Sequence, residues 1–102
     1  MSNYKFSFEP LEVKHIKTKN RDIHTNIPAP GTREIFNNLQ KYESRSMHGQ
    51  LPIVWEKAKD FNIFDIKGNC WIDFTSAIFL ANVGHSNQNI SNAIKETLEN
   101  PL

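Results

Sequence analysis

The chain has 102 residues, 38% of them hydrophobic and 23% charged, with a formal net charge of +1 at pH 7. These values are ordinary for one small soluble domain and give no electrostatic argument for a nucleic-acid or acidic-membrane partner. No apolar run approaches the roughly 20 residues of a membrane-spanning helix, and polar residues interrupt positions 1–10, where a secretory signal needs an apolar core. The single cysteine, Cys70, excludes an internal disulfide and indicates a reducing, cytoplasmic environment.

Residues 1–27 predict an extended N-terminal arm, because apolar and polar residues alternate in it. Positive charge gathers in its second half, at Lys14, Lys17, Lys19 and Arg21. A basic arm that touches the phosphates of a nucleic acid is one interpretation. A solvated arm that lies on a larger body is the favoured one, because no aromatic side chain is interleaved with these lysines for base stacking.

Two helices are predicted, one on each side of the central region. The first is expected to begin with Thr32 as its N-cap. Its apolar residues recur at helical spacing: Ile35, Phe36, Leu39 and Tyr42. The second follows a cap at Ser86 or Asn87 and ends at Asn100, because Pro101 disfavours helical backbone at the residue before it. Its apolar face consists of Ile90, Ala93, Ile94 and Leu98.

The region between the helices predicts a three-stranded antiparallel meander, since short turns cannot connect parallel strands. The strands are expected at residues 53–55, 63–66 and 71–74, with a charged turn at 56–60. Gly68 stands where a tight hairpin turn needs a positive φ. The aromatic side chains present more surface than three strands can cover, so that a further body is needed: Trp55, Phe61, Phe64, Trp71 and Phe74. Helices and meander together predict an α+β fold.

The chain offers few residues for chemistry, and we assign no catalytic, cofactor-binding or metal-ligating residue. Its four histidines lie at spacings of no recognisable metal site. Cys70 is expected to be a small apolar residue near a turn. Asp65 and Asp73 flank the predicted hairpin, where hydrogen bonding to turns is favoured over an acid–base pair. Gly84 and His85 precede a helix and could offer backbone N–H groups to an anion.

A series of short motifs follows the order and spacing typical of one enzyme family. The motifs are Pro30-Gly31-Thr32, Glu56-Lys57-Ala58, Asp65-Ile66-Lys67-Gly68-Asn69, Trp71-Ile72-Asp73-Phe74 and Gly84-His85. Over about residues 28–100 the chain therefore resembles the N-terminal part of the class III (omega-type) pyridoxal-phosphate-dependent aminotransferases. It is most similar to the 4-aminobutyrate-aminotransferase-like branch of that family.

The resemblance implies a fold type I enzyme, in which the meander and its neighbouring helices belong to a minor domain packed against a large cofactor domain. It also implies pyridoxal 5'-phosphate as cofactor, an amino donor and a 2-oxo acid acceptor as substrates, and a homodimer. Neither a nucleic acid nor a membrane is implied as a partner. Ile78 and Phe79 stand where such enzymes bring side chains to the substrate, so both are candidates for the substrate pocket. Simple burial as packing residues is the equally open alternative.

This chain departs from the family pattern in two places and lacks several of its parts. Asn87-Gln88 stand where many members have His-Pro, so the entry to the last helix is expected to differ, and Ala77 stands where glycine is common. In the family, the lysine that binds the cofactor, the aspartate and aromatic residue on its ring, and the phosphate-binding turn all lie downstream. The 102-residue chain alone is therefore expected to bind no cofactor and to be inactive.

We accordingly expect an extended arm at residues 1–27 and a partial, truncated minor domain at residues 28–102, without the large cofactor domain. The first hypothesis is an N-terminal fragment of a transaminase that moves an amino group from an amine or amino acid to a 2-oxo acid. The alternative is a freestanding protein-interaction module that retains the meander and binds through its aromatic face. A nucleic-acid binder that uses the basic arm ranks third.

Overall fold

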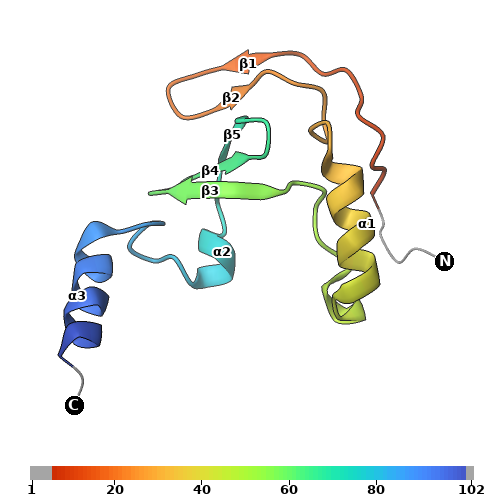
Figure 1. Ribbon diagram of the computed structural model, residues 1–102. Coiled ribbons are helices and arrows are strands. Elements are labelled where there is room, and N and C mark those ends of the chain that lie inside the picture. Colours follow the sequence, from red (N-terminus) through yellow and green to blue (C-terminus); the bar gives the residue numbers. More distant parts are fainter. Residues whose placement is uncertain (1–5, 101–102) are drawn as a thin grey trace.

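The computed structural model describes residues 6–100 of the chain. Residues 1–5 of the predicted arm and 101–102 of the predicted partial domain lie outside the described residues. The described part is an α+β fold centred on an antiparallel sheet with the strand order β1-β2-β5-β4-β3 (Figure 1). Its strands are β1 (Ile16–Lys17), β2 (Asp22–Ile23), β3 (Trp55–Lys59), β4 (Asn62–Asp65) and β5 (Cys70–Ile72). Its helical elements are α1 (Thr32–Tyr42), a short 3-10 helix (Arg45–Met47), α2 (Ser76–Phe79) and α3 (Gln88–Glu99).

The predicted meander is confirmed, with a correction to its first strand. β3 pairs with β4, and β4 with β5, both antiparallel, and Gly68 closes the second hairpin at φ 80°. However, β3 begins at Trp55 and runs through the charged residues, so the expected strand at 53–55 and charged turn at 56–60 are wrong. The turn lies instead at Asp60, whose φ is 53°. Charged residues are compatible with β3 because this strand is an edge of the sheet, where they face solvent and deter further strand pairing.

The N-terminal arm contributes two strands that the alternation of its residues did not predict. β1 pairs with β2, and β2 continues the sheet by pairing Asp22 with Cys70 of β5. The predicted sheet of three strands is therefore extended to five within the described residues. Strands of two residues are too short to give a periodic signal, so only their tertiary pairing reveals them.

One fully buried amide joins the arm to the meander. Asn69, in the turn before β5, has an exposed fraction of 0%. Its Oδ1 accepts hydrogen bonds from the backbone N–H groups of His24 (2.9 Å) and Thr25 (3.2 Å), just after β2. Its Nδ2 donates to Thr25 Oγ1 (2.7 Å) and to Asp65 Oδ2 (2.8 Å). Every hydrogen-bonding position of this side chain is thus used, as a buried amide requires.

Asp65 extends the same network into the hairpin. Its exposed fraction is 2%, and its Oδ1 accepts from the backbone N–H groups of Lys67 (2.9 Å) and Asn69 (3.0 Å). Its Oδ2 accepts from Trp71 Nε1 at 3.1 Å, in addition to the amide of Asn69. The favoured interpretation of this carboxylate, hydrogen bonding to a turn, is therefore correct.

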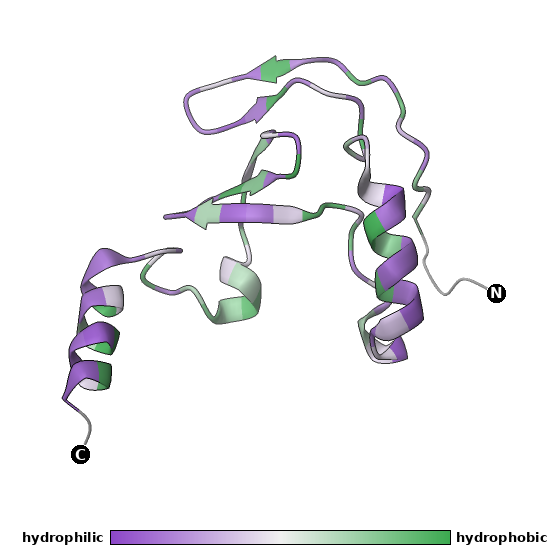
Figure 2. Ribbon diagram, in the orientation of Figure 1, coloured by the Kyte–Doolittle hydropathy of each residue, from purple (hydrophilic) through white to green (hydrophobic). Residues whose placement is uncertain are grey.

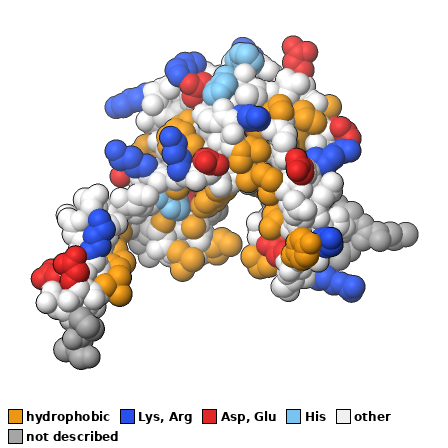
Figure 3. Space-filling model, viewed as in Figure 1, with side chains coloured by type: hydrophobic (Ala, Val, Ile, Leu, Met, Phe, Trp, Pro, Cys, Tyr) orange, Lys and Arg blue, Asp and Glu red, His pale blue; other side chains and the backbone are white. Residues whose placement is uncertain are grey.

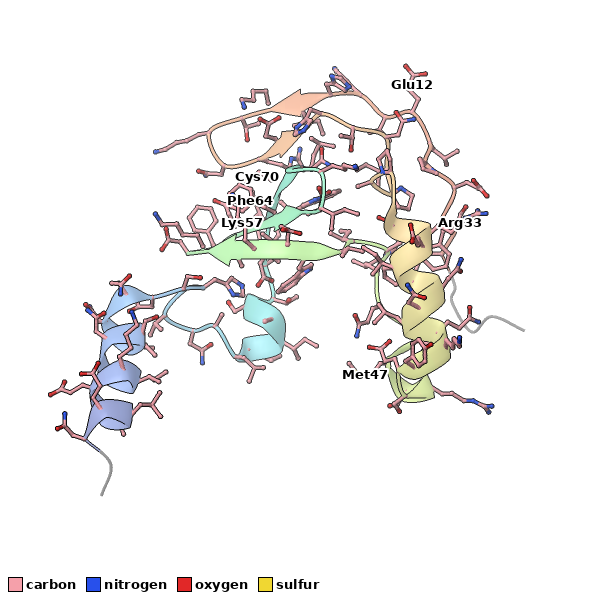
Figure 4. All side chains as sticks on the ribbon, viewed as in Figure 1. Glu12, Arg33, Met47, Lys57, Phe64 and Cys70 are labelled. Atoms are coloured by element: carbon pink, nitrogen blue, oxygen red, sulfur yellow. The ribbon has the colours of Figure 1, made fainter. Side chains whose placement is uncertain are left out.

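Helix α1 lies beyond one end of the sheet, beside the arm (Figure 1). Phe36 on its inner face is 3% exposed, and its ring centroid lies 4.9 Å from that of Phe8 in the arm. Arg33 on the same helix, labelled in Figure 4, forms an ion pair with Glu9. The helix was predicted correctly, but its N-cap is Gly31 at φ 97°, and Thr32 is the buried first helical residue.

Helix α3 stands apart from the sheet at the other end of the structure (Figure 1). It begins after Asn87, whose side chain accepts from the backbone N–H groups of Asn89 (3.0 Å) and Ile90 (3.3 Å), so the predicted cap is confirmed. Its apolar stripe runs along the side that faces α2, and the space-filling view shows hydrophobic side chains along that side (Figures 2 and 3). Three of these side chains are exposed: Ile90 (47%), Ile94 (56%) and Leu98 (74%). Among the described residues, none of the helices is long and apolar enough to cross a membrane.

We expect Asn69→Ala to destabilise the chain by about 2–4 kcal/mol, because it leaves several buried donors and acceptors without partners. Urea unfolding followed by tryptophan fluorescence measures this loss. The matched control is Asn38→Ala on the exposed side of α1, where no loss is expected. Equal effects of the two substitutions would show that the buried amide does not hold the arm to the meander.

Candidate functional site

The candidate site lies where the chain leaves β5. Asp73 follows this strand, and its backbone N–H donates to the carbonyl of Phe61 (2.8 Å), so that strand pairing fixes its position. Its side chain is only 4% exposed. Oδ1 accepts from the backbone N–H and the Oγ1 of Thr75, both at 3.0 Å. Oδ2 accepts from the backbone N–H of Ala77 and from Nε2 of His85, both at 2.8 Å.

These hydrogen bonds determine the ionisation of Asp73. Burial alone raises the pKa of a carboxyl group, because the charged form loses its hydration. At Asp73 the hydrogen bonds from His85, Ala77 and Thr75 outweigh burial and lower the pKa to about 2. The side chain is therefore a carboxylate throughout the physiological pH range, and it acts as an acceptor of four hydrogen bonds rather than as a proton donor.

The segment after Asp73 forms a left-handed helical turn. Consecutive non-glycine residues adopt positive φ angles: Ser76 (49°), Ala77 (51°), Ile78 (61°) and Phe79 (67°). The backbone N–H of Phe79 donates to Thr75 O (2.7 Å), and that of Leu80 to Ser76 O (2.9 Å), which closes the turn. Left-handed helical backbone costs about 1–2 kcal/mol per L-residue relative to the right-handed form. Such strain persists only where the surroundings enforce it, and it is concentrated at functional sites.

His85 ties the far end of this loop back to the sheet. Its backbone pairs with that of Asp60 in both directions, with N···O distances of 2.7 and 2.9 Å. Its ring lies edge-on to Trp55, with the centroids 5.8 Å apart. Gly84 allows this approach, because it has a φ of 87° and a Cβ at this position would lie 3.1 Å from the Cα of Asp60.

A cavity of about 320 Å³ opens beside the Asp73–His85 pair. Its lining includes Asp60, Phe61 and Ser76 as well as the pair itself. No lysine is among the described residues that line it, and two of its side chains are carboxylates, which disfavour a phosphate group. The residues present here therefore do not fit pyridoxal phosphate. No group of three or more His, Cys, Asp or Glu side chains that could hold a metal ion occurs in the described part of the chain, at this cavity or elsewhere.

The two substrate-pocket candidates, Ile78 and Phe79, lie on the left-handed turn and project away from the protein. Their exposed fractions are 77% and 78%, so neither is a buried packing residue of the described structure. They are not among the residues that line the cavity of Asp73 and His85. Their role in a substrate pocket remains a prediction.

The structure also shows the surroundings of Cys70 and of the two aspartates that flank the hairpin. Burial raises the pKa of the Cys70 thiol, in agreement with its expected role as a small apolar residue. It pairs with Phe64 across the β4–β5 ladder, and the Lys57 ammonium lies 5.0 Å from the centre of the Phe64 ring (Figure 4). Asp65 and Asp73 belong to separate hydrogen-bond networks, and the structure does not pair them for acid–base chemistry.

The sequence did not reveal the link between Asp73 and His85. The two residues are 12 positions apart, and neither periodicity nor a local motif joins them. The only available signal was that both belong to the motifs that carry the family resemblance.

Gly84→Ala is expected to destabilise the chain by about 1–3 kcal/mol, because a side chain at positive φ is strained and would also press on the Asp60 backbone. Thermal or urea unfolding measures the effect. Gly49→Ala is the matched control, since a Cβ there meets no atom within 4 Å. A Gly84→Ala chain as stable as wild type would contradict the close approach of these two segments.

The depressed pKa of Asp73 gives a pH dependence with a definite sign. Its network stabilises the folded chain fully above the pKa of an unfolded aspartate, about 3.9, and this stabilisation is lost as the pH falls towards 2. An NMR titration of the Asp73 carboxyl carbon should show a midpoint near 2. A midpoint near 4 would show that the hydrogen bonds do not favour the ionised form.

Comparisons with known proteins show which enzymes the sequence of this chain is similar to. No protein-family model matches the chain. Glutamate-1-semialdehyde 2,1-aminomutase of Methanocaldococcus jannaschii is 35% identical over 74 residues, which cover 67% of this chain and 17% of the relative. Acetylornithine aminotransferase of the same organism is 32% identical over 68 residues, with the same two coverages. The mitochondrial ornithine aminotransferase of Oryza sativa subsp. japonica is 32% identical over 68 residues, or 67% of this chain and 14% of the relative.

The matching region is large for this chain but small for the relatives. The chain spans less than a fifth of the length of these curated enzymes. Their similarity agrees with the resemblance that the motifs around Asp65, Asp73 and Gly84 indicated. Sequence similarity over about two thirds of its length thus relates this chain to the class III aminotransferases.

Proposed function

We propose that this chain is the N-terminal segment of a pyridoxal-phosphate-dependent class III transaminase. The whole enzyme would transfer an amino group from an amine or amino acid to a 2-oxo acid. The observation that carries the proposal is the similarity to aminotransferases over 67% of the chain. The cofactor belongs to the remainder of such an enzyme, since the cavity of this segment offers no lysine and presents two carboxylates.

The exposed apolar surface supports an assignment of residues 28–102 to a partial minor domain. Large apolar side chains of the loop after β5 are exposed well beyond what an isolated domain of this size usually shows: Phe74 (90%), Leu80 (83%) and Val83 (59%). α3 adds an exposed apolar face on the side that is turned towards α2 (Figure 3). Packing against a large cofactor domain, and pairing of two subunits, would cover such surface. A cytoplasmic location is part of the proposal.

Within such an enzyme, we assign Ile78 and Phe79 to the substrate pocket. A strained turn presents both side chains outwards, and neither has a packing role in the described structure. Strain and exposure of apolar side chains both need a compensating contact, which a bound substrate or a neighbouring domain supplies. The pair would contact the apolar part of the amino donor rather than its reacting amine, since neither side chain can hydrogen-bond.

The exposed apolar face also favours a second candidate function, a freestanding protein-interaction module. This function requires that the 102-residue chain remain folded and monomeric until a partner covers the face. The transaminase proposal instead requires that the face be covered by the remainder of the same enzyme. Size-exclusion chromatography and circular dichroism of the purified chain separate the two, because a self-associating or poorly folded chain contradicts the module.

We expect a chimera to report on the transaminase function. In this chimera, the segment of acetylornithine aminotransferase from Methanocaldococcus jannaschii that matches this chain over 68 residues is removed, and the matching segment of this chain takes its place. The chimera should retain cofactor absorbance and amino transfer. Ile78→Ala and Phe79→Ala should each lower kcat/KM by about tenfold for donors with apolar side chains, the usual effect of lost apolar contact in a pocket.

Tyr42→Ala serves as the control in this chimera, because Tyr42 is about as exposed (76%) as the two candidates but lies on α1, outside the apolar face that the remainder of the enzyme would cover. It should leave kcat/KM for the donors unchanged. A chimera that binds cofactor but shows no change of kcat/KM for any donor with either pocket substitution would contradict the assignment. A correctly folded chimera without amino transfer would contradict the proposed function itself.

A further inference from the structure

The turn that carries Ile78 and Phe79 is not favoured by its own sequence. Ser76, Ala77, Ile78 and Phe79 are L-residues with a Cβ, and the β-branched Ile78 is among the least tolerant of a positive φ. Three backbone hydrogen bonds close the turn, but a right-handed turn of the same length would form equivalent ones. The left-handed sense must therefore be imposed from outside the turn.

Asp73 is placed to impose it. Its two carboxylate oxygens accept from Thr75 N–H and from Ala77 N–H, so they hold the residue before the turn and the second residue of the turn at once. The carboxylate itself is fixed by the pairing of its backbone with Phe61. Charged acceptors form shorter and stronger hydrogen bonds to backbone N–H groups than neutral acceptors do.

His85 fixes the carboxylate from its other side. Its Nε2 donates to the same oxygen that accepts from Ala77, and its backbone is paired with Asp60. The start of the loop, the left-handed turn and the end of the loop thus meet at one carboxylate. This contact is 87% or more buried on both sides, because the exposed fractions are 4% for Asp73 and 13% for His85.

From this geometry we propose that Asp73 and His85 are positioning residues, whose carboxylate–imidazole contact enforces the left-handed turn and so sets the direction in which Ile78 and Phe79 project. The consequence for substrate choice rests on the proposed function, whereas the conformational role does not. In a right-handed turn the same two side chains would leave the backbone in other directions, since each Cβ is placed by its own φ and ψ. Asp73 acts on the pocket through the backbone and touches no substrate.

The test uses NMR of the 102-residue chain, because a residue with positive φ brings its amide hydrogen close to its own Hα and gives a strong cross-peak between them. The wild-type chain should show this signature at Ala77, Ile78 and Phe79. Asp73→Asn keeps one acceptor but cannot accept at both oxygens, and it should lose the signature. Asp60→Asn is the matched control, since it removes a carboxylate from the same cavity without touching the turn, and it should retain the signature.

A rescue variant separates positioning from general support of the fold. Glycine adopts positive φ without strain, so Ala77→Gly combined with Asp73→Asn should restore the signature at Ile78 and Phe79. Restoration supports the proposal even if Asp73→Asn alone fails to fold. The proposal is overturned if wild type lacks the signature, if Asp73→Asn retains it, or if glycine does not restore it. Failure of the transaminase chimera would leave this result unaffected.

Discussion

The fold depends on the hydrogen bonds of one buried amide, that of Asn69. This side chain joins the β4–β5 hairpin to the backbone that follows β2, which lies 44 and 45 positions away in the sequence. β2 meets β5 at a single residue pair, so the four hydrogen bonds of this amide add substantially to the pairing of the arm with the meander. A buried amide is costly when unpaired but specific when fully paired, so it selects one register for the arm.

Polar networks have this importance because the apolar core is small. The buried hydrophobic residues of the described structure are Ile23, Ala29, Phe36 and Ile63. A small domain buries a limited share of its surface and needs other sources of stability or further contacts. The hydrogen-bond network of Asp65 and Asn69, at the β4–β5 turn, is such a further source of stability. The exposed apolar face of the β5–α3 loop and of α3 indicates that further contacts cover it.

The network of Asp73 repeats the same principle at the site. An ionised carboxylate with four hydrogen bonds, from Thr75, Ala77 and His85, offsets the strain of several residues in left-handed backbone. The strain is thereby stored beside a cavity, in a chain related to enzymes that act on amino groups. Ile78 and Phe79 occupy the strained backbone and face outwards, where a substrate or a neighbouring domain can reach them.

The sequence by itself determined the meander, helices α1 and α3, the turn glycine Gly68 and a cap at Ser86 or Asn87, because these depend on local periodicity and on residue-specific turn chemistry. It also indicated the relationship to class III aminotransferases, through motifs that keep their order and spacing. Only the tertiary structure decided the two strands of the arm, the exact extent of β3, and the contact of Asp73 with His85. Strands of two residues and an edge strand of charged residues carry no periodic apolar pattern, and a contact between side chains twelve positions apart has no local signal, so only the pairing seen in the folded chain reveals them.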